Sequence, residues 1–272
     1  MSPSISSKRA TKTSTMERAI SPPPLRTTHS SAKVTTTTTT STYRLSLHAH
    51  PTQNPSWHQP THTLMVAHYT SHHSINTTSK PHPAIDPATP SKIAAFDLDH
   101  TLTAPKTGSI HSQSATDWRF LYPCIPTTLR NLSATGYKII IFTNQGGLKP
   151  EYVGMFKAKI AGVLAEIDVD CIVYVARGDD RYRKPRTGMW GVMRGDVGGD
   201  VDMEACFYVG DAAGREGDHS NADKGFAEGV GLRFYTPEEF FLGEKPKVEE
   251  KESSGEESEK DDDGHLDSNG SA

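Results

Sequence analysis

The stretch Ile93-Ala94-Ala95-Phe96-Asp97-Leu98-Asp99-His100-Thr101 decides the fold and the chemistry that we expect for this chain of 272 residues. Its four leading apolar residues predict a strand with both faces covered, as in a parallel sheet. The strand ends at Asp97 and Asp99, and open α/β sheets bind their ligands at the carboxyl ends of the strands. A turn after Asp97 would bring both carboxylates over one pocket, where one can attack a substrate and the other can move protons.

The chain has a net charge of −4, and its composition divides it into three parts. Residues 1–88 are rich in Ser, Thr, Pro and His, and over residues 1–85 eight Lys/Arg face the single acid Glu17. We expect this part to be a disordered basic arm, because it has too little apolar surface to offset the entropy of ordering. Residues 244–272 are rich in Glu, Asp, Ser and Lys and predict an acidic disordered tail. Residues 89–243 are expected to form one compact domain.

Two other interpretations of the basic arm are a mitochondrial transit peptide and a segment that holds nucleic acid without sequence preference. Its nine histidines show no metal-ligand spacing. Cys124, Cys171 and Cys206 are isolated in the sequence, which argues against a disulfide scaffold or a structural zinc site and fits a reducing compartment. No apolar run approaches the roughly 20 residues that a membrane span requires, so we expect no membrane association.

Apolar runs alternate with helical patterns through residues 89–243. After the first strand, the expected strands are 138–142, 171–176, 206–209 and 231–235, and the expected helices are 126–132, 150–167, 187–194 and 236–240. This alternation predicts a doubly wound, mostly parallel α/β sheet of the Rossmann-like kind. A large cap domain is not expected, because the 43 residues between Asp99 and Thr143 and the 39 between Asn144 and Lys184 are used by the sheet's own strands and helices.

Each of four expected strands ends in polar groups of a different kind. Along the chain, these groups are Asp97 with Asp99, Thr143 with Asn144, the basic pair Arg183 and Lys184, and Asp211. Parallel strands end on one edge of the sheet, so the groups should converge. Carboxylates suit a hard cation such as Mg²⁺, while a lysine, a hydroxyl and backbone amides suit a phosphate. The combination predicts phosphoryl transfer.

The four strand ends, which read Asp97-Leu98-Asp99-His100-Thr101, Thr143-Asn144, Lys184 and Gly210-Asp211, resemble the four motifs of the haloacid-dehalogenase superfamily of phosphotransferases. Longer segments are similar to the polynucleotide 3′-phosphatase family, the phosphatase part of polynucleotide kinase 3′-phosphatase: residues 117–123, 142–145, 183–190, 210–215 and 236–241. The resemblance covers about residues 90–243. His100 departs from it, because the family commonly has Gly there, and would either crowd the turn or contact the phosphate at the pocket mouth.

The resemblance implies an enzyme, a Mg²⁺-dependent phosphoric monoester hydrolase that removes 3′-phosphates from DNA ends during strand-break repair. It implies that Asp97 attacks the phosphorus to form an aspartyl-phosphate and that Asp99 is the general acid and base. The residues implied in phosphate binding are Thr143, Asn144 and Lys184. The implied ligands of Mg²⁺ are Asp97, Asp99 through its backbone carbonyl, and Asp211, with either Asp218 or Asp223 in support. The candidate nucleic-acid contacts are Arg119, Arg183, Arg186 and Arg215.

Bifunctional relatives also carry a kinase domain, but no Gly-x-x-x-x-Gly-Lys-Ser/Thr segment occurs here, so we expect no 5′-kinase activity. A repair role places the protein in the nucleus, with a mitochondrial pool if the arm is a transit peptide. We expect a monomer whose tails recruit repair proteins. The alternatives are a capless phosphatase of sugar or histidinol phosphates, a protein phosphatase, and a non-catalytic nucleic-acid-binding module. The preference for DNA or RNA, and for single-stranded, nicked or gapped ends, stays open.

Overall fold

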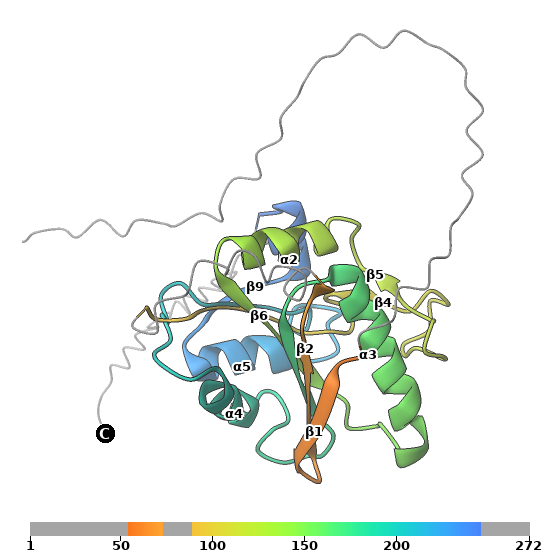
Figure 1. The fold of residues 1–272 in the computed structure, drawn as a ribbon. Helices are drawn as coiled ribbons and strands as arrows, with labels where there is room; N and C mark the ends of the chain where they lie inside the picture. Colours follow the sequence, from red (N-terminus) through yellow and green to blue (C-terminus); the bar gives the residue numbers. More distant parts are fainter. Residues whose placement is uncertain (1–53, 73–88, 246–272) are drawn as a thin grey trace, which may run out of the picture.

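A seven-stranded sheet with the order β1-β2-β7-β6-β3-β8-β9 forms the centre of the computed structural model, which describes residues 54–72 and 89–245 (Figure 1). Its strands are β1 (Ser56–Thr61), β2 (Leu64–Tyr69), β3 (Lys92–Phe96), β6 (Tyr137–Asn144), β7 (Cys171–Ala176), β8 (Phe207–Val209) and β9 (Arg233–Tyr235). The five strands from β7 to β9 in this order pair in parallel, and the β1–β2 hairpin adds to β7 in antiparallel register. The predicted mostly parallel α/β fold is confirmed.

Helices cover both faces of this sheet. On one face lie α2 (Ile125–Ala134) and α3 (Val153–Ile167), and on the other lie α4 (Gly188–Val197) and α5 (Ala222–Val230) (Figure 1). The residues of β6 alternate between the two cores: Ile139 and Ile141 pack on the side of α2 and α3, while Ile140 and Phe142 pack on the side of α4 and α5. Two apolar cores explain why the central strands read as continuous hydrophobic runs.

The shorter elements refine the sequence-based expectations. A two-stranded sheet of β4 (Thr103–Ala104) and β5 (Arg119–Phe120) lies between β3 and α2 in the chain, and a 3₁₀ turn, η1 (Pro150–Tyr152), leads into α3. The expected closing helix is instead a five-residue π-helix, η2 (Glu238–Leu242). Helix α5 was not predicted, because its glycines lower helix propensity. Two of them allow a close approach: a Cβ at Gly225 would lie 3.0 Å from Pro185, and a Cβ at Gly229 would lie 3.1 Å from Thr187.

The β1–β2 hairpin contradicts the expectation that all of residues 1–88 form a disordered arm. Strand β2 pairs with β7 along its whole length, and Leu64 and Val66 are fully buried. The six residues of β2 are mostly apolar and can pack in the sheet. We did not predict this strand because the surrounding sequence is rich in Ser, Thr and His. The rest of the expected arm and tail, residues 1–53, 73–88 and 246–272, lies outside the described residues. Among the described helices, none has the length and apolar character of a membrane span.

Candidate active site

Asp97 and Lys184 form the buried centre of the strand-end cluster. Asp97 follows β3 directly, and Lys184 lies in the loop between β7 and α4. The Lys184 ammonium group donates to Asp97 Oδ1 at 2.6 Å, to Asp223 Oδ1 at 2.7 Å and to the Phe142 carbonyl at 2.8 Å. The Tyr208 hydroxyl, 2.9 Å from the ammonium group, also donates to Asp223 Oδ1 at 2.9 Å. The predicted meeting of residues from separate strand ends is therefore present in the structure.

Three carboxylates gather around this lysine. One ligand atom each from Asp97, Asp211 and Asp223 lies within 4.8 Å of the others. Burial, followed by repulsion from Asp223 and Asp211, raises the pKa of Asp97 well above its ordinary value, although Lys184 opposes the shift. Burial and Asp223 also raise the pKa of Asp211. One ammonium group thus does not compensate the negative charge that the buried Asp97 and Asp223 and the half-buried Asp211 would carry together.

Asp99 belongs to the same strand end but has different partners. Gln145 Nε2 donates to Asp99 Oδ2 at 2.7 Å and to Thr143 Oγ1 at 2.9 Å, so one amide links Asp99 to the end of β6. Lys159, from the middle of α3, donates to Asp99 Oδ1 at 2.7 Å. Asp99 is partly exposed while Asp97 is buried. The two aspartates therefore have the different environments that different chemical roles require.

The side chain of Asn144 holds the backbone of the lysine loop. Its Nδ2 donates to the Lys184 carbonyl at 3.0 Å, and the Lys184 backbone N–H donates to Asn144 Oδ1 at 2.9 Å. This reciprocal pair fixes the point at which the lysine enters the site. We predicted Asn144 as a phosphate contact, and its backbone amide is not engaged by these bonds.

The structure separates Asp218 from Asp223, which spacing alone did not. Asp223 lies in the first turn of α5 and is buried beside Lys184. Asp218 pairs instead with Arg215 at 3.0 Å and accepts the backbone N–H groups of Ala213 and Arg215. Asp218 therefore shapes the loop before α5, and Asp223 joins the acidic cluster.

The four arginines that we predicted as nucleic-acid contacts differ in their surroundings. Arg119 is exposed on β5, and Arg183 lies beside the loop after β6, where a Cβ at Gly146 would be 2.7 Å from its Nη1. Arg186 pairs with the exposed Asp179 at 2.7 Å. Arg215 pairs with Asp218 and, at 3.1 Å, with Glu238. Two of the four are thus already paired with acids.

His100 occupies a turn that favours glycine. Its φ of 61° lies in the left-handed region, which histidine adopts more readily than most residues. Its Nε2 is 3.2 Å from the Ile110 carbonyl, and the residue is exposed. The ring thus contacts the loop after β4 at the edge of the site.

Three contributors to the site were missed in the sequence: Lys159, Gln145 and Tyr208. Lys159 could have been recognised from the sequence, because it falls three residues after Phe156 on the apolar face of α3, where a lysine is unusual. Gln145 directly follows the Thr143-Asn144 pair that we did identify. Tyr208 reads as an ordinary buried strand residue, and only the fold shows that its hydroxyl meets Asp223.

A parallel sheet that gathers carboxylates, a lysine and a threonine at its carboxyl edge defines an α/β protein of the haloacid-dehalogenase phosphatase class. Within that class, the family described as polynucleotide kinase 3 phosphatase matches residues 92–241. The chain belongs to this family.

Curated proteins that are similar to this chain are named as polynucleotide phosphatases. The chain is 43% identical over 154 residues to the bifunctional polynucleotide phosphatase/kinase of Schizosaccharomyces pombe, covering 56% of this chain and 38% of that protein. It is 41% identical over 169 residues to the polynucleotide 3′-phosphatase ZDP of Arabidopsis thaliana, covering 56% and 24%. It is 28% identical over 208 residues to the polynucleotide 3′-phosphatase of Saccharomyces cerevisiae, covering 56% and 87%. The match thus spans less than half the length of the first two relatives.

Proposed function

We propose that this chain is a Mg²⁺-dependent polynucleotide 3′-phosphatase that removes 3′-phosphates from DNA ends through an aspartyl-phosphate on Asp97. The observation that carries the proposal is the contact of Lys184 with both Asp97 and Asp223, at 2.6 and 2.7 Å, at the carboxyl edge of the sheet. Membership of the polynucleotide kinase 3 phosphatase family and the names of the relatives support the choice of a polynucleotide end as substrate.

The proposed reaction has two steps. In the first, an Asp97 carboxylate oxygen bonds to phosphorus, the bond from phosphorus to the 3′-oxygen breaks, and protonated Asp99 gives its proton to that oxygen. In the second, Asp99 takes a proton from water, whose oxygen attacks phosphorus and releases inorganic phosphate from Asp97. Thr143 and the Asn144 backbone amide hold the phosphate oxygens that are not transferred, and Lys184 contributes positive charge.

The acidic cluster fits a magnesium ion. Asp97, Asp211 and Asp223 offer the oxygen ligands that Mg²⁺ takes, with ligand atoms within 4.8 Å of one another. The pKa values of Asp97 and Asp211, raised by burial and by repulsion from neighbouring carboxylates, chiefly Asp223, indicate charge that a divalent cation would offset. When bound, the ion supplies charge stabilisation for the phosphoryl group. Of the predicted ligands, Asp99 has its side chain engaged with Lys159 and Gln145, so only its backbone carbonyl is left for this part.

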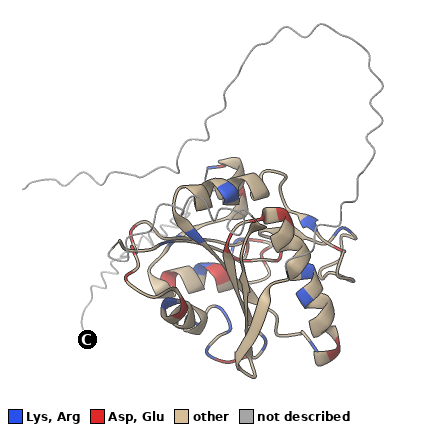
Figure 2. Cartoon of the chain, in the orientation of Figure 1, with Lys and Arg blue, Asp and Glu red and all other residues tan. Residues whose placement is uncertain are grey.

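The rim of the site suits a long anionic substrate. The described residues 100–142 add only the small β4–β5 sheet and α2 to the central sheet, and residues 145–183 add only η1 and α3, so neither segment supplies a cap domain. Basic positions occur near β5 (Figure 2), and the exposed Arg119 belongs to β5. We propose Arg119 and Arg183 as contacts to backbone phosphates. For Arg186 and Arg215 this role requires that the phosphate displace a carboxylate partner.

The test is phosphate release from a DNA oligonucleotide with a 3′-phosphate, in Mg²⁺ and after chelation, by the wild type and Asp97→Asn. We expect release that needs Mg²⁺ and falls to background in Asp97→Asn. A matched RNA oligonucleotide, a 3′-mononucleotide and a sugar phosphate are compared as substrates. Faster turnover of the small phosphates would keep the chemistry and reject the polymer-end substrate. No release from any of them would reject the enzyme assignment.

We also propose that the chain lacks 5′-kinase activity, since its 272 residues contain no Gly-x-x-x-x-Gly-Lys-Ser/Thr segment. Incubation of a 5′-hydroxyl oligonucleotide with labelled ATP should leave it unlabelled. A nuclear location, with a mitochondrial pool if the N-terminal segment is a transit peptide, follows from the proposed repair role and is tested by imaging the tagged full chain. The monomeric state that we expect is tested by light scattering.

A further inference from the structure

Two histidines of the N-terminal hairpin lie on the face of the sheet that α4 covers. Residues of β2 alternate between faces, and Leu64 and Val66 pack into the core beneath α4 and α5. His68 is two residues further along β2, so it shares that face. His58 pairs directly with Val66 across the hairpin and therefore points the same way. The two imidazole rings stack with their centroids 5.2 Å apart.

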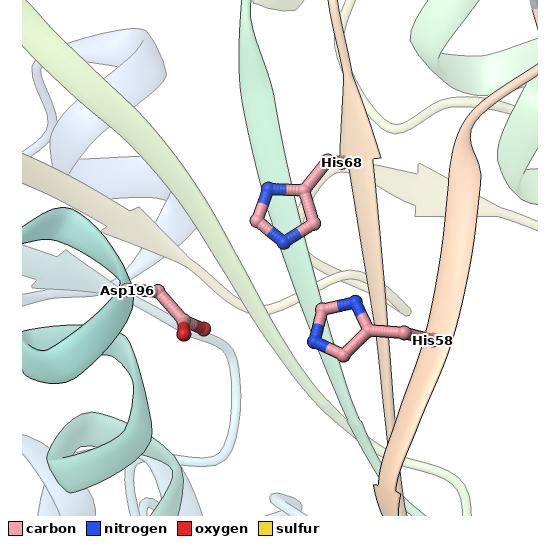
Figure 3. Close-up of side chains that lie close together, drawn as sticks. All are labelled: His58, His68 and Asp196. Atoms are coloured by element: carbon pink, nitrogen blue, oxygen red, sulfur yellow. The ribbon is translucent and has the colours of Figure 1, made fainter.

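Asp196, in the last turn of α4, approaches the histidines from above the sheet (Figure 3). One ligand atom from each of His58, His68 and Asp196 lies within 4.8 Å of the others. The carboxylate is held by a second observation, since the fully buried Tyr174 donates its hydroxyl to Asp196 Oδ2 at 2.8 Å. That bond orients the carboxylate and leaves Oδ1 for another partner.

We propose that His58, His68 and Asp196 form a site for a divalent transition-metal ion of the zinc class. Two imidazole nitrogens with one carboxylate suit Zn²⁺, whereas Mg²⁺ and Ca²⁺ prefer sites made of oxygens alone. Three protein ligands leave a fourth position of a tetrahedral ion for water. The hydrogen bond from Tyr174 is the outer-sphere support that metal-binding carboxylates usually have.

The site joins two parts of the fold that are distant in sequence. The hairpin is the antiparallel addition to the sheet, and α4 packs across β7. An ion at this position would fasten the outermost strand, β1, to α4. His68 pairs with Ile172 near the amino end of β7, while the catalytic cluster lies at the carboxyl edge, so the two sites are at opposite ends of the strands. Sequence spacing could not reveal it, because hairpin pairing and helix packing create the site.

The test is calorimetric titration of the full-length protein with Zn²⁺ in excess Mg²⁺, which occupies the proposed catalytic cluster. We expect the wild type to bind one equivalent of zinc more than His58→Ala, His68→Ala or Asp196→Asn. His62→Ala is the matched control, because His62 is exposed in the turn of the same hairpin and outside the cluster. It should retain this equivalent. Tyr174→Phe should bind about tenfold more weakly, through loss of the outer-sphere bond.

Two further readouts separate a built site from scattered histidine binding. At about one hundred times its dissociation constant, zinc should raise the wild-type Tm by about 5 °C, and this rise should be absent in His58→Ala. Co²⁺ should give a visible spectrum typical of tetrahedral coordination in the wild type and in His62→Ala, and this spectrum should be absent in the three ligand variants. Phosphatase turnover in Mg²⁺ should not change in His58→Ala. Equal zinc stoichiometry and equal Tm shifts in the wild type and the three ligand variants would overturn the proposal, as would retention of the site by Asp196→Asn.

Discussion

The ammonium group of Lys159 lies 2.7 Å from Asp99 Oδ1, so a residue from the middle of α3 fixes the proposed proton donor after β3. Gln145 donates to the other carboxylate oxygen, Oδ2, at 2.7 Å. Both oxygens of Asp99 thus have donors from different elements. The side chain of Lys159 is 7% exposed and that of Asp99 is 34% exposed, so the pair reaches from the α3 core to the open edge of the site.

We predict that Lys159→Met lowers turnover of a 3′-phosphorylated oligonucleotide about tenfold, a part of the roughly 10²–10⁴-fold that general acid–base catalysis supplies. Lys159 would act as a positioning residue, through Asp99. An aryl phosphate, whose leaving group needs little protonation, should lose much less. The measurement is kcat on both substrates for the variant and the wild type.

The matched control for this prediction is Lys157→Met, two residues earlier on α3. Lys157 places its ammonium group 5.1 Å from the ring centroid of Trp57 and does not contact Asp99 in the described structure. Its turnover should match the wild type on both substrates. If Lys159→Met lowers kcat equally on the oligonucleotide and the aryl phosphate, then Lys159 has a structural role and does not position the general acid.

The bonds between Asn144 and the Lys184 backbone predict a stability effect as well as a catalytic one. Asn144→Ala leaves a backbone N–H and a carbonyl without their partners, which should cost about 2 kcal/mol of unfolding free energy. Turnover should fall too, since Lys184 would lose its anchored position. Urea unfolding and kcat are measured beside Asn131→Ala, a change on the exposed side of α2 that should stay within about 0.5 kcal/mol. Equal stability of the two variants would contradict the anchoring role.

The central strands that are buried on both faces were predicted from the sequence, whereas other elements of the fold, including β2 and α5, were missed. Strands β3, β6 and β7 are covered on both faces, so their apolar runs are unmistakable. Strand β2 is also a largely apolar, buried run, but it was not predicted because the residues around it in the sequence are rich in Ser, Thr and His. Helix α5 escaped detection because it contains Gly225 and Gly229, which the close approach to the segment after Lys184 requires.

The candidate site was predictable where its residues lie at the carboxyl ends of strands. Asp97 directly follows β3, Thr143 is the second-last residue of β6, and Asp211 comes two residues after β8, so parallel pairing alone brings them to one edge. The choice between Asp218 and Asp223 depended on where α5 begins, which its glycine-rich sequence obscured. Lys159 reaches the site from the side of a helix, so its contact with Asp99 depends on how α3 packs and not on a strand end.

Gly210 gives a prediction about the acidic cluster. A Cβ at this position would overlap the carboxyl group of Asp223, which is itself fixed by Lys184 and Tyr208. Gly210→Ala should therefore displace Asp223 and remove the stabilisation of the fold by Mg²⁺, measured as the Tm difference with and without the ion. Gly191→Ala is the control, because its Cβ would meet nothing within 4 Å on α4. That change should raise stability by about 0.5–1 kcal/mol and keep the response to Mg²⁺. A full Mg²⁺ response in Gly210→Ala would contradict a part for Asp223 in the cluster.

Leu64 tests whether the hairpin is an integral part of the fold, against the expectation of a disordered arm through residue 88. Its side chain is fully buried on β2, and an arm without structure would tolerate its truncation. Because Leu64→Ala leaves a cavity between the sheet and the α4 side, it should lower the free energy of unfolding by about 3 kcal/mol. Ile110→Ala is the matched control, since Ile110 is 76% exposed and should change stability by less than about 0.5 kcal/mol. Both are measured by urea unfolding of the full chain. If the two variants unfold at the same urea concentration, then the hairpin does not contribute to the cooperative fold, and the sheet would end at β7.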